Sequence, residues 1–202
     1  MKLLFAYLFL SVLFINCSNS NSQSAFEGTI TKHKTAPVGT ISSQSIYMLT
    51  DTFQTQENKN ITLSSFAGKP TVVGMIFTNC TYACPRLTAD IKDIEEKLKG
   101  EKEKVNFLLV SFDSKRDDPA QLKKFGVNLD LDKNWTLLHG SEEAVRTLSV
   151  LLNVQFEKDA EGNFSHSNII SILDKGGVLQ YQKEGLNADQ TETISNIDQL
   201  LQ

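Results

Sequence analysis

Cysteine and histidine are scarce in this sequence, with three residues of each type among 202. Cys17 lies in the N-terminal segment, so the rest of the chain holds one close pair, Cys80 and Cys84. Two of the histidines are poorly placed as ligands, because His33 belongs to a polar segment and His139 ends a predicted strand. Structural zinc sites take four cysteine or histidine ligands. The scarcity therefore argues against a structural zinc site and leaves one thiol pair to carry chemistry.

Basic residues are not in excess either. The chain has 20 lysines and arginines against 24 acidic residues, a formal net charge of −4, and no basic patch stands out. Because nucleic-acid binding usually needs such a patch, we expect no nucleic acid among the partners. The apolar share of 40% and the charged share of 22% are ordinary for a globular protein. No internal repeats are evident, so the length predicts one domain whose function comes from a local site.

The first fifteen residues have a composition of their own. Lys2 precedes an apolar run over residues 3–15, which is shorter than the roughly 20 residues of a transmembrane helix and is typical of a signal peptide. Asn16 and Cys17 then resemble a bacterial lipoprotein cleavage site, at which Cys17 becomes the lipidated first residue. A plain secretory signal with an incidental cysteine is the alternative. We predict a lipid-anchored protein that faces the periplasm or the extracytoplasmic side of a bacterium.

Three regions follow from this composition. Residues 1–17 are predicted to be the signal peptide with its lipoprotein cysteine. Residues 18–40 are rich in Ser, Asn, Gln and Thr, which bury too little apolar surface to fold, so we expect a flexible tether. Residues 41–202 are predicted to be the folded domain.

The domain alternates between strand and helix patterns. The apolar run over residues 71–77 is typical of a central strand that is covered on both faces. Other expected strands are residues 45–49, 105–112, 135–138, 169–173 and 178–182, and the expected helices are residues 85–100, 119–125, 141–152 and 188–201. Glycines in residues 174–177 favour a hairpin between the last two strands. This order predicts an α/β sandwich around a mixed sheet.

The cysteine pair lies where a strand is followed by a helix, a usual place for sites in such sheets. Proline is favoured at the first helical position, so Pro85 places Cys84 at the helix N-cap and Cys80 in the loop before it. Unpaired N–H groups and the helix dipole there are expected to lower the thiol pKa. Two thiolates suit Cu(I), but the same pair can cycle between dithiol and disulfide, or form a structural disulfide.

His166 stands just before the predicted strand 169–173. In a parallel or mixed sheet this position is in a loop near a strand end, where the imidazole can face the cysteines and act as a third ligand. A histidine in a surface loop is the equally simple alternative, and spacing alone leaves both open.

Three segments together resemble the Sco/SenC family. Residues 76–85, Ile-Phe-Thr-Asn-Cys-Thr-Tyr-Ala-Cys-Pro, look like its cysteine signature. Residues 111–119, Ser-Phe-Asp-Ser-Lys-Arg-Asp-Asp-Pro, are similar to its second motif, and His166 with the hairpin at residues 174–177 is similar to its third. The resemblance covers roughly residues 45–201 in the correct order. Two departures, Ser114 in place of proline and the Thr-Tyr-Ala insert at residues 81–83, remove no ligand.

The family resemblance implies a thioredoxin-like fold with extra N-terminal strands and a copper chaperone acting on cytochrome c oxidase. It implies Cys80, Cys84 and His166 as ligands of Cu(I), with an added oxygen or water for Cu(II). Asp113 is implied as a residue that tunes the site or the histidine, with a turn-capping aspartate as the alternative. Arg116, Asp117 and Pro119 are expected to shape the loop and not to touch the metal.

The expected partners are the copper-receiving subunit of the oxidase, through its binuclear copper centre, and an upstream copper donor or thiol reductant. Copper delivery breaks no substrate bond, so the protein is expected not to be an enzyme. The rival function is a thiol–disulfide oxidoreductase, for which Cys80 and Cys84 would be the redox pair, and a peroxidase ranks third.

The positions of the prolines help to distinguish a copper chaperone from a thiol–disulfide oxidoreductase. Thioredoxin-like oxidoreductases carry a cis-proline before a late strand, next to the cysteines. The four prolines here are Pro37, Pro70, Pro85 and Pro119, so none precedes Ile169. His166 stands at roughly that place, which favours metal binding over disulfide exchange.

Overall fold

A computed structural model describes residues 42–202 of the chain. The predicted signal peptide, the lipidation of Cys17 and the tether over residues 18–40 lie outside the described residues. Within residues 42–202, no helix is both long enough and apolar enough to cross a membrane.

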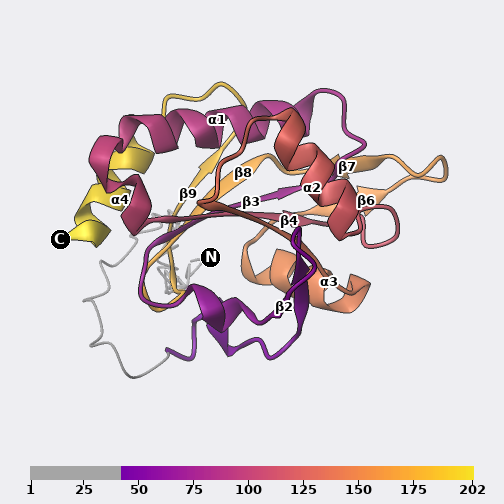
Figure 1. The fold of residues 1–202 in the computed structure, drawn as a ribbon, viewed down its shortest axis with the longest axis horizontal. Helices are drawn as coiled ribbons and strands as arrows, with labels where there is room; N and C mark the ends of the chain where they lie inside the picture. Colours follow the sequence, from indigo (N-terminus) through magenta and orange to yellow (C-terminus); the bar gives the residue numbers. More distant parts are fainter. Residues whose placement is uncertain (1–41) are drawn as a thin grey trace, which may run out of the picture. The chain divides into compact units, whose positions relative to one another are not determined.

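Seven strands form one mixed sheet in the order β2-β1-β5-β4-β3-β8-β9 (Figure 1). The expected α/β class with helices around a mixed sheet is therefore confirmed. The strands of this sheet are β1 Phe53–Thr55, β2 Asn60–Ile61, β3 Thr71–Ile76, β4 Asn106–Ser111, β5 Trp135–His139, β8 Ile169–Leu173 and β9 Leu179–Glu184.

Strand β3 lies at the centre and carries the chain to the cysteines. All six of its residues are buried, as the apolar run predicts for a strand covered on both faces. It pairs in parallel with β4, with Thr71 opposite Asn106, and antiparallel with β8, with Thr71 opposite Leu173. The pairing with β8 ends at Gly74, whereas β4 pairs with β3 as far as Ile76 and so holds the end of β3 before the turn that follows.

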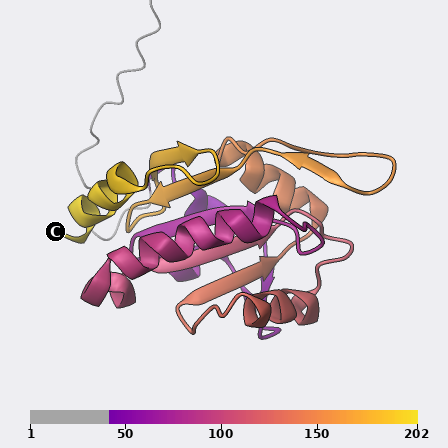
Figure 2. The same ribbon diagram turned by 90° about the horizontal axis from the view of Figure 1, so that it is seen from above.

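Helices cover both faces of the sheet. Figures 1 and 2 show α1 (Ala83–Lys97), α2 (Pro119–Asn128) and α4 (Thr191–Leu201) on one face, and α3 (Glu142–Leu151) on the other. Helix α1 buries Leu87, Ile91 and Ile94, which recur at helical spacing. It lies close to β3 because Gly74 has no side chain: a Cβ there would stand 2.9 Å from the Cδ1 atom of Ile91.

Several local predictions are wrong. Residues 45–49 form a 3₁₀ helix, η1 (Ile46–Met48), and only Ser45 makes a β-bridge, with Val178. Helix α1 begins at Ala83, between the two cysteines. Cys84 therefore lies in its first turn, and Pro85 is the third helical residue and not the first. Strand β1 was not predicted, because three residues are too few to show the alternation of apolar and polar residues that is typical of a strand. Two further 3₁₀ helices, η2 (Leu63–Phe66) and η3 (Lys99–Lys104), complete the chain.

A second, two-stranded sheet projects from one end of the main sheet (Figures 1 and 2). It is a hairpin of β6 (Phe156–Lys158) and β7 (Phe164–His166), in which Phe156 pairs with His166. His166 therefore ends a strand, whereas the sequence predicted a loop. The hairpin escaped prediction because polar and charged residues outnumber apolar ones along it.

Candidate metal centre

The two cysteines come from the turn between β3 and α1. Cys84 is fully buried at 0% exposure, and Cys80 is partly exposed. Both carry free thiols. The Cys84 amide donates to the Cys80 sulfur at 3.3 Å, and the Phe77 amide donates to the Cys84 sulfur at 3.4 Å. The backbone thus orients both sulfur atoms toward the same side of the turn.

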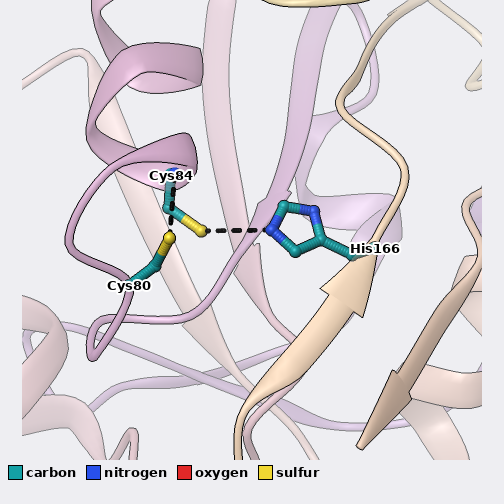
Figure 3. Close-up of side chains that lie close together, drawn as sticks. All are labelled: Cys80, Cys84 and His166. Carbon is teal, nitrogen blue, oxygen red and sulfur yellow. Dashed lines mark hydrogen bonds between the residues drawn. The ribbon is translucent and has the colours of Figure 1, made fainter.

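His166 completes the group from the opposite side (Figure 3). Its Nε2 atom lies 3.7 Å from the Cys84 sulfur, and its Nδ1 atom lies 3.1 Å from the Ser167 carbonyl oxygen. A carbonyl oxygen only accepts, so Nδ1 carries the proton and Nε2 presents its lone pair to the thiols. This is the tautomer that a metal ligand needs, and the carbonyl holds the ring in place.

The ligand atoms of Cys80, Cys84 and His166 all lie within 4.8 Å of one another. Within residues 42–202 this is the one group of cysteine, histidine or carboxylate side chains placed to share a metal ion. Two soft sulfur donors and one imidazole suit Cu(I), which prefers thiolate and accepts few ligands. The donor set therefore fits copper, and the structure brings together the three residues that the sequence singled out.

Burial dominates the electrostatics of the buried thiol. Loss of solvent raises the pKa of Cys84 well above its usual range, and the hydrogen bond from the Phe77 amide opposes this only in part. The negative charge of Asp117 also raises the pKa. The expectation of a lowered thiol pKa is wrong for Cys84, because the loss of solvent outweighs the hydrogen bond from the backbone amide.

Aromatic rings surround the imidazole. The His166 ring centroid lies 5.0 Å from that of Phe112 and 6.0 Å from that of Phe77. Phe164 packs against both phenylalanines, at 4.9 Å from Phe112 and 5.1 Å from Phe77. Phe156 stacks on Phe112 at 5.0 Å. The rings shield one side of the site from water and join the hairpin to the ends of β3 and β4.

Asp117 holds the start of the loop over residues 77–82, between β3 and α1, which we call the cysteine loop. Its fully buried carboxylate accepts hydrogen bonds from the Thr78 amide at 2.8 Å, from the Thr78 hydroxyl at 2.6 Å and from the Ser111 hydroxyl at 2.6 Å. Its carbonyl oxygen accepts from His139 Nδ1 at 2.9 Å. His139 thus has a structural partner. Asp117 shapes the loop, as expected of the second motif, although only the structure shows that the loop it shapes includes Thr78.

Asp113 is buried, at 1% exposure, but it stands outside the group of three ligand atoms. Its carboxylate forms an ion pair with the Arg116 guanidinium, and Lys158 Nζ lies 3.5 Å from its Oδ1 atom. Its amide donates to the Ser111 hydroxyl at 3.0 Å. Both of its oxygens are therefore engaged by cations.

Comparison with known proteins places these features in one family. The model of the SCO1/SenC family matches residues 42–202. The SCO1 protein homolog of Bacillus subtilis (strain 168) is 42% identical over 154 residues, which cover 72% of this chain and 78% of that protein.

Solved structures agree. BsSco, described as a Sco family member of the cytochrome c oxidase assembly proteins with a disulfide switch, is 30% identical with a TM-score of 0.63, covering 73% of this chain and 88% of that chain. Copper-bound ScoI of Bradyrhizobium japonicum is 23% identical with a TM-score of 0.65, covering 74% and 96%. The fold is the thioredoxin-like fold of these proteins.

Proposed function

The chain belongs to the SCO1/SenC family, and we propose that it is a metallochaperone that delivers copper to the binuclear copper centre of cytochrome c oxidase during assembly. The observation that carries the proposal is the convergence of Cys80, Cys84 and His166, whose ligand atoms lie within 4.8 Å of one another. The copper bound by the Bradyrhizobium protein and the oxidase-assembly role given for BsSco support the same cargo and destination.

Each residue has a distinct task in this proposal. Cys84, fixed in the first turn of α1, is the inner thiolate, and His166 offers Nε2 from the other side. Cys80 is partly exposed, so an incoming ligand of the acceptor reaches the metal on its side. Copper is the cargo, and transfer is an exchange of ligands in which the acceptor's donors replace those of this chain one at a time.

Binding of copper displaces the proton of each thiol. The Phe77 amide and the Cys84 amide point at the sulfur atoms and stabilise the charge that remains. Cu(I) is satisfied by three such ligands, whereas Cu(II) takes an additional oxygen donor or water.

A second function rests on the same thiols. The two cysteines are close and free, so they can form a disulfide, and the disulfide switch described for BsSco favours this chemistry. In this alternative the protein is a thiol–disulfide oxidoreductase that reduces the cysteines of a copper-receiving partner. Oxidation of Cys80 and Cys84 to the disulfide supplies the two electrons that reduce the partner's disulfide.

The N-terminal predictions complete the proposal. Residues 1–17 would be removed as a signal peptide up to the lipidated Cys17, and residues 18–40 would tether the domain to the membrane. This arrangement would keep the domain beside a membrane-bound oxidase on the extracytoplasmic side. The copper-receiving subunit is the downstream partner, with a copper donor or a thiol reductant upstream.

An anaerobic titration of the reduced protein with Cu(I), followed by X-ray absorption of the product, tests the proposal. We expect one copper per chain with about two sulfur neighbours and one nitrogen neighbour. Absence of stoichiometric binding, together with a readily exchanged Cys80–Cys84 disulfide, would contradict the chaperone and favour the oxidoreductase.

A further inference from the structure

A buried carboxylate connects the main domain to the hairpin that carries His166. Asp113 lies just beyond β4, and its ion pair with Arg116 is formed within the same loop. Arg116 also reaches across to the hairpin, where its Nη2 atom donates to the Gly162 carbonyl oxygen at 2.5 Å. Lys158, the last residue of β6, approaches Asp113 from the hairpin itself. Asp113 thus meets the hairpin directly at Lys158 and, through Arg116, at Gly162.

Besides these contacts, Arg146 of α3 holds the hairpin backbone, because its Nη1 atom donates to the Phe156 carbonyl oxygen at 3.2 Å. In the described part of the chain, β6 and β7 pair only with each other. At its root, Phe156 stacks on Phe112 and lies against the Arg146 guanidinium, 4.0 Å from the ring centroid. Nearer its turn, Phe164 packs against Phe112 and Phe77. Towards its turn, the cations complete the attachment: Arg116 lies 5.9 Å and Lys158 5.1 Å from the centroid of the Phe164 ring.

We propose that Asp113, Arg116 and Lys158 form a clamp that positions His166, with Asp113 acting through the hairpin instead of on the metal. The inference deepens the proposed copper site and rests on it for the affinity measurement alone. His166 ends β7, so the distance between its imidazole and the Cys84 thiol depends on how the hairpin is held. The clamp keeps the third ligand against the thiols, and its opening releases that ligand.

The charges explain why the clamp is effective. A carboxylate that is 1% exposed is costly to bury without a cation, so Asp113 strongly favours the arrangement in which Arg116 and Lys158 face it. Both cations remain partly exposed, at 39% and 38% of their side chains, so they can swing into solvent. The attraction between core and hairpin is therefore directional and reversible.

The first test uses the metal-free protein. The His166 ring protons lie beside Phe77 and Phe112, so their NMR signals carry ring-current shifts that report the closed hairpin. We expect Arg116→Gln and Lys158→Gln each to move these signals toward their unshifted positions, and the double variant to move them further. Lys123→Gln, which removes an exposed ion pair with Glu57, is the matched control and should leave them unchanged. Unchanged signals in the double variant would overturn the proposal.

The second test is a double-mutant cycle on Cu(I) affinity. We expect the Arg116→Gln, Lys158→Gln double variant to bind copper about tenfold more weakly, because the competent arrangement is less populated. In a His166→Ala background the same two changes should have no effect, since the clamp acts only through that ligand. An equal loss in both backgrounds would show a general structural role and contradict the clamp.

Asp113→Asn separates the clamp from direct metal contact. In the His166→Ala background we expect no further loss of copper affinity, whereas a further loss would make Asp113 a participant at the metal and overturn the proposal. If the wild-type protein binds no copper, the proposed function fails, and the NMR shifts of the metal-free variants still decide whether the clamp exists.

Discussion

The two halves of the metal centre are built in opposite ways. Cys84 lies inside the first turn of a 15-residue helix and follows a central strand that is hydrogen-bonded on both edges. His166 ends a three-residue strand in a separate two-stranded sheet, and its side chain is only partly buried. The two thiols belong to the core of the domain, and the imidazole belongs to the peripheral hairpin of β6 and β7.

If the chain delivers copper as proposed, this difference suits the release of the metal. Elements with few core contacts open locally at much lower free energy than central strands. In the proposed function, the hairpin would withdraw one ligand while the thiolates keep the metal, which would leave a coordination position for an acceptor. A site built entirely from the core would bind as well but exchange its ligands more slowly.

Removal of single ligands should give the largest effect. Cys80→Ser or Cys84→Ser is expected to abolish tight copper binding, because one thiolate and one imidazole hold Cu(I) poorly. His166→Ala should weaken binding by more than about 100-fold and make the metal labile, yet leave the disulfide able to form. Competitive Cu(I) titration of the three variants checks this order. Unchanged affinity in His166→Ala would remove that residue from the ligand set.

Two neighbouring phenylalanines allow the stability of the core to be compared with that of the hairpin. Phe77 is 5% exposed and belongs to the core, whereas Phe164 is partly exposed on the hairpin, 5.1 Å away. We expect Phe77→Ala to cost about 3–5 kcal/mol in the free energy of unfolding and Phe164→Ala about 1 kcal/mol. Urea unfolding of both variants measures this. Equal costs would mean that hairpin and core unfold as one unit.

Asp117→Asn tests the firmness of the cysteine loop. The carboxylate accepts three hydrogen bonds from Thr78 and Ser111, and an amide in its place must point its NH2 group at one of these donors. We expect a loss of about 2–3 kcal/mol in the free energy of unfolding. Asp118→Asn, which keeps an N-cap at the start of α2, is the control and should cost much less. A similar loss in both would argue against a special role of Asp117.

The smallest expected effect is kinetic and compares the two thiols. Cys80 is partly exposed, whereas Cys84 is buried and its pKa is raised by that burial. Alkylation of the reduced protein near pH 8 should therefore modify Cys80 at least about tenfold faster than Cys84. Mass spectrometry of peptides at early times gives the ratio. Faster modification of Cys84 would show that the turn opens readily and that the thiol half is not rigid.

Much of the core architecture was predictable from local patterns. The run that became β3 is almost entirely apolar, and α3 follows the expected helix over residues 141–152, with Ser141 as its cap. The β8–β9 hairpin follows from glycines at residues 176 and 177. Such features succeed because the signal lies in neighbouring residues. The hairpin of β6 and β7 has no such signal, since its strands are short and mostly polar.

The sequence by itself determined the thiol pair, its place between a strand and a helix, and a single candidate histidine for a third ligand. Only the tertiary structure decided that this histidine, 82 residues beyond Cys84, meets it at 3.7 Å and presents Nε2. The same holds for the burial that raises the Cys84 pKa and for the cations that engage Asp113. The type of each ligand follows from a single residue. The distance between the ligands, the tautomer of the imidazole and the desolvation of the thiol depend on the packing of segments that are far apart in the chain.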